Sequence, residues 1–235
     1  MTSKPLTVAI EDAIEQARDM DGSVNERLRY IASEVRKLNP NFADAVERLI
    51  ARLKSSSAGA ASPGPGEPMP PFLLPDESGH LVSLESLLDK GPVAVAFNRG
   101  HWCPYCRLNT TALQKVQQEV AAFSGQIVAI MPDRQKYTMR LKSDAKAEFP
   151  FLTDIDNGYA MSLNLVIWVG TEMQGLMPKS GVELPEIQGN SAWMLPLPAT
   201  FVVGTDGLIR QRHVDPDYRT RMEVDDLLAA LKEAA

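Results

Sequence analysis

The sequence predicts an α/β fold in which helices flank a mixed β-sheet, with a helical extension at the N-terminus. Two observations support this prediction. Residues 5–54 carry apolar side chains at helical spacing, whereas beyond a segment rich in Gly and Pro short apolar runs alternate with amphipathic stretches. Strands that alternate with helices are typical of a sheet covered by helices on its faces. The 235 residues allow one domain with an appendage, or two small domains.

The N-terminal segment has the pattern of short amphipathic helices. Residues 23–26 (SVNE) have the form of a capping box, and Asn39 and Pro40 close one helix and open the next. Such one-sided helices are stable only when their apolar stripes are buried. We therefore expect residues 1–54 to be a structural or dimerisation appendage, and a homodimer formed through these helices would bury them. A recognition module for another protein is the less favoured alternative.

Residues 55–67 are expected to form a flexible linker. They consist almost entirely of Ser, Ala, Gly and Pro, which bury too little surface to order themselves. This composition predicts a domain boundary, with the helical extension at 1–54 and a second domain at 68–235.

The second domain has the pattern of alternating strands and helices. The predicted strands are 80–84, 92–97, 126–131 and a hairpin of 199–204 with 208–214. The predicted helices are 104–123, 134–147 and 224–232. Residues 92–97 and 126–131 are continuously apolar, as in strands buried on both faces. Residues 165–198 look like an irregular insertion of the kind that often covers a site.

The composition excludes several classes of function. The chain is 44% hydrophobic and 23% charged, with a formal net charge of -6. A mildly acidic chain lacks the electrostatic footprint of a protein that binds nucleic acid or an anionic membrane. We see neither a membrane-spanning stretch nor the apolar core of a signal peptide, and therefore expect a cytoplasmic location. Reducing surroundings there disfavour a structural disulfide.

The chain's two cysteines, Cys103 and Cys106, both lie within residues 98–107 (NRGHWCPYCR). This stretch joins a predicted buried strand to a predicted helix, at the sheet edge where α/β folds place their sites. The N-terminus of a helix stabilises a thiolate, and a three-residue step brings the two sulfurs within disulfide reach. Arg99 and Arg107 can add positive potential, and Trp102 can shield the site.

Thiol redox chemistry is the favoured interpretation of this pair. A structural zinc site needs four ligands, usually as two close pairs, and the chain has no second cysteine pair. Inert buried cysteines would need neither a helix N-terminus nor flanking arginines. We therefore expect no metal and no organic cofactor.

Several stretches carry a family resemblance: FNRGHWCPYCR, QGNSAWMLPLPATF, VDPDYRTR and, more weakly, PMPPFLLPDESGHLVSLESLL. Through them residues 68–232 resemble the peroxiredoxin-like branch of the AhpC/TSA (redoxin) family, in the thioredoxin superfamily. The resemblance implies a thioredoxin-like, peroxiredoxin-type fold that opens with a hairpin, and makes 68–235 the catalytic domain. Residues 1–54 lie outside the typical catalytic domain of this family.

The resemblance leaves the attacking sulfur open. The peroxiredoxin motif Pro-x-x-x-Thr-x-x-Cys aligns Cys106 with the cysteine that attacks peroxide, Cys103 with the Thr and Arg99 with the Pro. Thioredoxin logic instead makes Cys103 the nucleophile and Cys106 the resolving cysteine. Both alignments share one register.

A second departure concerns the residue before the strand at 199–204. Peroxiredoxins place there an arginine that polarises the bound peroxide, whereas this chain has Pro198. Thioredoxins place a cis-proline there, and Pro198, Ala199 and Thr200 fit that pattern, so we expect a cis bond before Pro198 and include Pro198 and Thr200 among the supporting residues. Another guanidinium must then activate peroxide, and Arg99 and Arg107 are the nearest in sequence.

The resemblance implies a thiol-dependent peroxidase that reduces hydrogen peroxide or organic hydroperoxides through a Cys103/Cys106 dithiol–disulfide cycle. Its partner would be a thioredoxin- or glutathione-type reductant. Pro198 keeps a second hypothesis open, a thiol–disulfide oxidoreductase that acts on protein disulfides. A third is a redox-sensing interaction module, in which the cysteine pair changes how residues 1–54 pack.

Overall fold

The computed structural model describes residues 6–235, so the first five residues of the predicted extension lie outside the described residues. Three helices form the described part of the extension: α1 (Leu6–Asp19), α2 (Val24–Leu38) and α3 (Pro40–Ser55). The predicted capping box is present, because the Ser23 hydroxyl accepts from the Glu26 N–H and the Glu26 carboxylate accepts from the Ser23 N–H. Asn39 ends α2 and caps α3, whose first residue is Pro40, as predicted.

A five-stranded mixed sheet forms the centre of the remaining chain. Its strands are β3 (Val93–Phe97), β4 (Gln126–Met131), β5 (Phe151–Thr153), β8 (Ala199–Val203) and β9 (Ile209–Val214). They lie in the order β5-β4-β3-β8-β9. β3, β4 and β5 are parallel, whereas β8 is antiparallel to both of its neighbours. The predicted mixed sheet and the predicted hairpin of β8 with β9 are therefore confirmed.

Helices cover both faces of the sheet, and β3 shows how its residues divide between them. Ala94 and Ala96 pack under the helices of one face: α5 (Pro104–Lys115), α6 (Gln117–Ala122), α7 (Gln135–Ala145) and α11 (Val224–Ala234). Val95 and Phe97 pack on the other face, beneath α4 (Leu84–Leu88) and α8 (Gly158–Ser162). The expected N-terminal hairpin is also present, as β1 (Leu73–Pro75) and β2 (Leu81–Ser83).

The structure adds β5, α4 and α8, which the sequence did not predict, and it differs from the predicted elements at 104–123 and within 165–198. The helix predicted over 104–123 is divided into α5 and α6, because the backbone at Val116 leaves the helical region. The insertion at 165–198 is not irregular throughout. It holds β6 (Val166–Trp168), α9 (Thr171–Leu176), the turn η2 (Pro178–Ser180), α10 (Leu184–Gln188) and β7 (Met194–Pro196). Each of these elements is too short to show a periodic pattern in the sequence.

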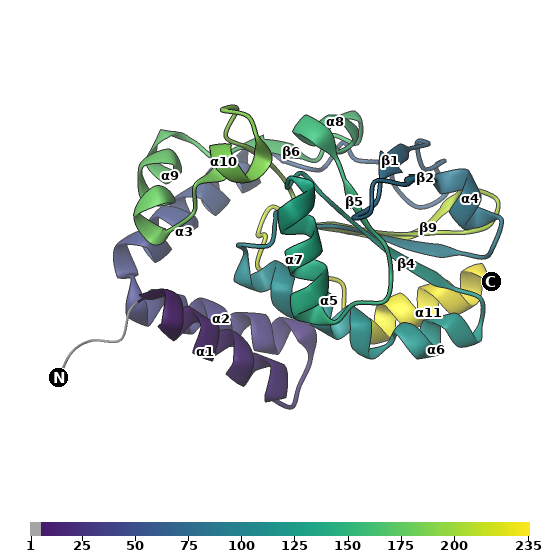
Figure 1. The fold of residues 1–235 in the computed structure, drawn as a ribbon, viewed down its shortest axis with the longest axis horizontal. Helices are drawn as coiled ribbons and strands as arrows, with labels where there is room; N and C mark the ends of the chain where they lie inside the picture. The colour runs from purple at the N-terminus through teal and green to yellow at the C-terminus, as the bar shows by residue number, and fades with distance from the viewer. Residues whose placement is uncertain (1–5) are drawn as a thin grey trace.

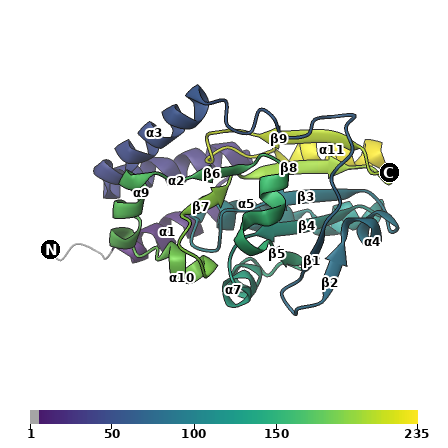
Figure 2. The ribbon, with the colours of Figure 1, turned by 90° about the horizontal axis from the view of Figure 1, so that it is seen from above.

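The N-terminal helices pack against the rest of the same chain. α1 and α2 lie side by side against α5, and α3 lies against α9 (Figures 1 and 2). Their apolar stripes share one cluster of buried residues with both cysteines. A dimer is therefore not needed to cover these stripes.

The linker at 55–67 runs along the edge strand β9. The Gly66 N–H donates to the Ile209 carbonyl (2.8 Å), and the Ile209 N–H donates to the Glu67 carbonyl (2.9 Å). The Arg212 guanidinium donates to the Ser62 hydroxyl at 2.9 Å. These bonds give the linker a defined path, while the division of the chain into two domains at this point stays a prediction.

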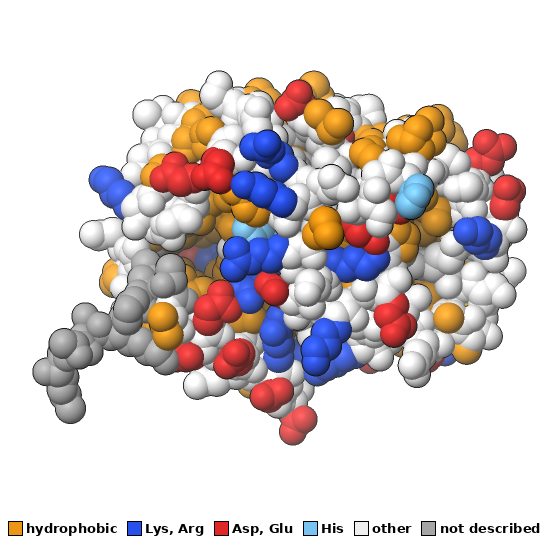
Figure 3. Space-filling view, in the orientation of Figure 1, with side chains coloured by type: hydrophobic (Ala, Val, Ile, Leu, Met, Phe, Trp, Pro, Cys, Tyr) orange, Lys and Arg blue, Asp and Glu red, His pale blue; other side chains and the backbone are white. Residues whose placement is uncertain are grey.

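On the face of the molecule in view, basic and acidic side chains are interspersed (Figure 3). Within residues 6–235 no helix is long and apolar enough to cross a bilayer.

Candidate active site

Both cysteines lie where β3 leads into α5. Cys103 is the N-cap of α5, Pro104 is its first residue and Cys106 follows within the first turn. Both thiols are free and buried, with exposed fractions of 1% for Cys103 and 0% for Cys106. The cysteine pair thus occupies the sheet edge and helix start that its sequence position predicts.

The two thiols have opposite electrostatic surroundings. Burial alone would raise the pKa of Cys106, but its hydrogen bond with Cys103, the Arg221 guanidinium and the backbone N–H of Arg99 outweigh burial and lower that pKa to about 6. The Arg99 N–H and the Arg221 Nη2 lie 3.3 Å and 3.6 Å from the Cys106 sulfur. Burial and the hydrogen bond with Cys106 raise the pKa of Cys103. At neutral pH this arrangement favours a thiolate on Cys106 and a thiol on Cys103.

Arg221 is a site residue that the sequence analysis missed. Its side chain is 2% exposed and also donates to the carbonyls of Tyr218 and Thr220. It lies just before α11, far along the chain from Cys106. One signal was available, because Arg221 is the last residue of the VDPDYRTR stretch that carries part of the family resemblance.

Arg99 lies at the site, as expected, but its guanidinium is engaged by aromatic rings. It lies 3.7 Å from the centroid of the Tyr218 ring and 5.1 Å from that of Trp102. Tyr105 meets Tyr218 edge to face, with the ring centroids 5.6 Å apart. These rings form an aromatic wall beside the cysteines, and the part of Arg99 that contacts Cys106 is its backbone N–H.

Arg107 does not supply the guanidinium expected from its place in the sequence. It forms a bidentate ion pair with the Glu11 carboxylate of α1, at 2.6 Å and 2.8 Å. Its second acidic neighbour is Asp144, at 3.7 Å. The position of a residue around a helix fixes the direction of its side chain, and Arg107 lies on the side of α5 that faces α1. Its ion pair with Glu11 therefore holds the extension against α5.

Pro198 and Thr200 lie beside the strand that carries the cysteine loop. In the antiparallel pairing of β3 with β8, Ala199 lies opposite Phe97 and Thr200 lies opposite Ala96. Pro198 therefore comes immediately before the first residue of β8. The expected cis bond before Pro198 is wrong, since residues 6–235 contain no cis peptide bond. The chain passes from β7 almost directly into β8 without a tight turn, and the trans form is favoured for most bonds to proline.

The loop before Cys103 is held by a buried carboxylate. Asp133, at the end of β4, accepts from the backbone N–H of His101 (2.8 Å) and lies 2.9 Å from the His101 Nδ1. Burial raises the pKa of Asp133, and these contacts with His101 partly offset the rise. Gly100 has φ +146°, and a Cβ there would lie 2.5 Å from the Trp102 Nε1 and 2.6 Å from the Asp133 Oδ1. Glycine is therefore required for this loop.

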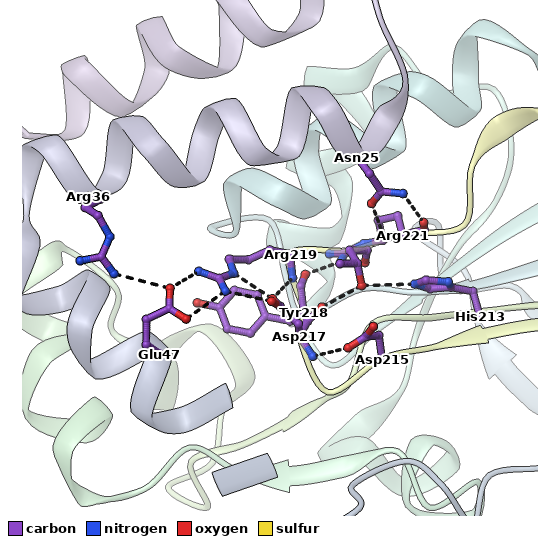
Figure 4. Close-up of polar contacts among 10 residues, drawn as sticks. Asn25, Arg36, Glu47, His213, Asp215, Asp217, Tyr218, Arg219 and Arg221 are labelled. Atoms are coloured by element: carbon purple, nitrogen blue, oxygen red, sulfur yellow. Dashed lines mark hydrogen bonds and ion pairs between the residues drawn. The ribbon is translucent and has the colours of Figure 1, made fainter. Parts of the chain in front are cut away.

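The extension holds the segment that carries Arg221 (Figure 4). The Asn25 side chain of α2 accepts from the Arg221 backbone N–H (2.8 Å) and donates to the Arg221 carbonyl (2.9 Å). Glu223 accepts from the N–H groups of Val24 and Asn25 at 2.9 Å and 3.1 Å. These bonds join the N-terminus of α2 to the backbone of Arg221 and to the side chain of Glu223.

Asp217 and Arg219 extend this connection to α3. Arg219 pairs with Glu47 of α3 at 2.6 Å and with Asp217 at 2.8 Å. The Asp217 N–H donates to the Asp215 carboxylate at 2.7 Å, which makes 215–219 a turn before the last helix. The turn presents Tyr218 to the site.

Comparison with known proteins assigns the central part of this chain to a family. Residues 65–212, more than half of the chain, match the model of the AhpC/TSA family. No curated protein matches the chain in sequence. The extension, Tyr218 and Arg221 all lie outside the matched residues.

Solved structures of peroxiredoxins share the fold. The chain is similar to peroxidoxin BcpB from Mycobacterium tuberculosis, with 20% identity, a TM-score of 0.57 and coverage of 73% of this chain and 98% of that chain. It is similar to peroxiredoxin Q from Xanthomonas campestris, with 16% identity, a TM-score of 0.52 and coverage of 69% and 90%. For peroxiredoxin 6 of Arenicola marina the values are 14%, 0.55, 71% and 71%. At these identities the likeness supports the thioredoxin-like fold.

Proposed function

The chain belongs to the AhpC/TSA family, and from this premise we propose that it is a thiol-dependent peroxidase that reduces hydrogen peroxide or organic hydroperoxides. The observation that carries the proposal is the surroundings of Cys106. A buried sulfur with a lowered pKa, next to a guanidinium and a backbone N–H, is an activated nucleophile with donors for a bound peroxide. We propose that Arg221 takes the role of the arginine that Pro198 replaces.

In the first step, the Cys106 thiolate attacks the terminal oxygen of the hydroperoxide. The S–O bond forms as the O–O bond breaks, which yields a sulfenic acid on Cys106 and an alkoxide or hydroxide that takes up a proton. The Arg221 guanidinium stabilises the negative charge that develops on the leaving oxygen. The hydrogen bond between Cys103 and Cys106 makes the Cys103 thiol the nearest proton donor.

In the second step, the sulfur of Cys103 attacks the Cys106 sulfenic acid. The Cys103–Cys106 disulfide forms as the S–O bond breaks, and the oxygen leaves as hydroxide, which takes up a proton to give water. A thioredoxin- or glutathione-type thiol then attacks this disulfide at Cys103, which lines the cavity beside the site. Cys106 leaves as the thiolate, because the thiol with the lower pKa is the better leaving group. A second thiol of the reductant then attacks the mixed disulfide, which frees Cys103 and leaves the reductant as its disulfide. A reducing compartment such as the cytoplasm suits this cycle.

A thiol–disulfide oxidoreductase is the second candidate, favoured by the C-x-x-C pair next to Pro198. The Arg99 N–H and the Arg221 guanidinium at the Cys106 sulfur are donors that a bound peroxide can use and that thiol–disulfide exchange does not need, which supports the peroxidase over this alternative.

The test compares reduced wild type, Cys103→Ser and Cys106→Ser after one equivalent of peroxide, by reaction rate and intact mass. Cys103→Ser is expected to react fast and gain one oxygen, whereas Cys106→Ser reacts slowly. The wild type is expected to lose two hydrogens. A wild-type rate no better than that of free cysteine would overturn the peroxidase proposal, and fast oxidation of Cys106→Ser would reverse the roles of the two sulfurs.

A further inference from the structure

The buried guanidinium of Arg221 depends on the Cys106 sulfur for its counter-ion. Its Nη2 lies 3.6 Å from that sulfur, and its Nη1 donates to the carbonyls of Tyr218 and Thr220. Its Nε is buried and has no hydrogen-bond partner among the described residues. The partners that the described part of the chain gives this guanidinium are therefore two carbonyls and one sulfur, and the negative charge among them is that of the thiolate.

Formation of the Cys103–Cys106 disulfide removes this counter-ion. The pair gives up two electrons, the proton of the Cys103 thiol leaves, and neither sulfur of the product carries a charge. An oxidant such as glutathione disulfide takes up the two electrons, and with that proton and one more from water it becomes two glutathione thiols. Arg221 is then a buried cation among neutral atoms, which is costly unless water reaches it. Oxidation therefore favours a movement that exposes the guanidinium.

The segment that would have to move is bonded to the N-terminus of α2 (Figure 4). The Asn25 side chain accepts from the Arg221 backbone N–H at 2.8 Å and donates to the Arg221 carbonyl at 2.9 Å. The Glu223 carboxylate accepts from the N–H groups of Val24 and Asn25 at 2.9 Å and 3.1 Å. We call these bonds of Asn25 and Glu223 the α2 latch. A movement of the Arg221 backbone must break the α2 latch or carry α2 with it.

Packing joins the redox site to the same helix. Both cysteines belong to one cluster of buried residues with Leu28 and Ile31 of α2. Another attachment of the extension lies away from the sulfurs, where Arg48 of α3 pairs with Glu172 of α9 at 2.6 Å. All of the extension lies outside the residues that match the family. The α2 latch is therefore a contact between the redox pair and a segment that this chain adds to the family's domain.

We propose that the α2 latch links the extension to the redox state of the cysteine pair, so that the extension docks more tightly on the dithiol form than on the disulfide form. Coupling between two equilibria is reciprocal. The docked extension must therefore favour the dithiol and raise the reduction potential of the pair by the same free energy. This linkage goes beyond the proposed function, because it holds whichever oxidant the pair takes.

The first test measures the equilibrium of the full chain with glutathione and glutathione disulfide at pH 7, with the disulfide fraction read by thiol alkylation and intact mass. Asn25→Ala breaks the α2 latch and should shift this equilibrium toward the protein disulfide by about fivefold or more, which is about 20 mV for a two-electron couple. Arg48→Met is the matched control, because it removes the attachment that lies away from the sulfurs, and it should leave the equilibrium unchanged.

A double-mutant cycle separates this linkage from a general loss of stability. In the Arg221→Met background, Asn25→Ala should have no further effect on the glutathione equilibrium, because the guanidinium through which the α2 latch acts is absent. A purely structural effect of Asn25→Ala would be the same in both backgrounds.

The second test needs no variant, so it remains decisive if Asn25→Ala fails to fold. The first N–H groups of a helix have no acceptor within the helix, and those of Val24 and Asn25 donate to Glu223. Their hydrogen exchange, followed by NMR, therefore reports on the α2 latch. We expect these two amides of the wild type to exchange faster in the disulfide form than in the dithiol form. The amides of β3, in the centre of the sheet, are the internal reference.

The outcomes separate this linkage from the proposed function. Equal exchange of the two amides in both redox forms would overturn the linkage, and so would equal glutathione equilibria for a folded Asn25→Ala variant and the wild type. A shift of the same size in Arg48→Met would overturn the assignment to the α2 latch. None of these measurements uses a peroxide, so each of these failures leaves the peroxidase intact. Slow consumption of peroxide would sink the peroxidase and leave the linkage standing.

Discussion

Replacing Arg221 by Met is expected to raise the pKa of Cys106 from about 6 toward the ordinary range of a thiol. The guanidinium Nη2 lies 3.6 Å from the sulfur and both groups are buried. A unit charge pair at such a distance, with an effective dielectric constant near 20, is worth roughly 5 kcal/mol as an upper bound. Each kcal/mol is worth roughly 0.7 of a pKa unit, so the loss of even half of this interaction removes most of the lowering.

The change in pKa sets the size of the kinetic effect. A thiol with a pKa of about 6 is about nine-tenths thiolate at pH 7. One with an ordinary pKa of roughly 8.5 is roughly three-hundredths thiolate at that pH. The rate of reaction with peroxide at pH 7 should therefore fall roughly thirtyfold from ionisation alone, since the thiolate is the nucleophile.

The assay is a pH titration of the ultraviolet absorbance of the thiolate in the Cys103→Ser background, where Cys106 is the only thiol and the Ser hydroxyl can still donate to it. Arg107→Met is the matched control, because Arg107 pairs with Glu11 and its loss should leave the midpoint in place. Arg221→Lys keeps the charge and should give an intermediate midpoint. Circular dichroism verifies that each variant is folded. Equal midpoints for Arg221→Met and Arg107→Met would refute the assignment of Arg221.

The further predictions concern pH, the extension and the loop. The rate of peroxide consumption should fall as the pH drops through about 6 and level off above it, because protonation removes the Cys106 thiolate. Stopped-flow rates over this pH range measure the profile. A midpoint of the profile near the pKa of free cysteine would contradict this prediction. Folding lowers this pKa, so the stability that the thiolate contributes should likewise be lost as the pH falls through about 6. Asn25→Ala removes both side-chain bonds to the backbone of Arg221 and should lower the free energy of unfolding by about 1–3 kcal/mol while raising the pKa of Cys106. The control is Asn41→Ala, at an exposed position of α3. An unchanged midpoint of the Cys106 titration in Asn25→Ala would show that the extension does not position Arg221. Gly100→Ala should lower the free energy of unfolding by about 2 kcal/mol or more, since the added Cβ meets Trp102 and Asp133 at a positive φ. Gly175→Ala, where a Cβ meets nothing within 4 Å, should have little effect in the same denaturant titration, and equal midpoints for the two glycine variants would disprove the steric argument.

Local order along the chain was readable from the sequence. Three elements depend only on residues a few positions apart, whose spacing the sequence gives directly. They are the capping box at Ser23, the helix boundary at Asn39 and the buried strand β3. The position of Cys103 at a helix start follows from the same local pattern. The elements that escaped prediction, such as β5 and the short helices α9 and α10, are those with too few residues to repeat a pattern.

Contacts between distant segments were decided by the tertiary structure alone. The sequence by itself determined that the two cysteines lie close together at the start of a helix, because that depends on residues within one turn of each other. It pointed to Arg99 and Arg107 for the guanidinium, yet Arg221 reaches Cys106 because α2 holds its backbone through Asn25. The extension, which the sequence presents as an appendage, packs against α5 and forms one wall of the cavity at Cys103. Spacing along a chain reports neighbours on one helix or strand, whereas the partners of a buried sulfur depend on how separate elements pack together.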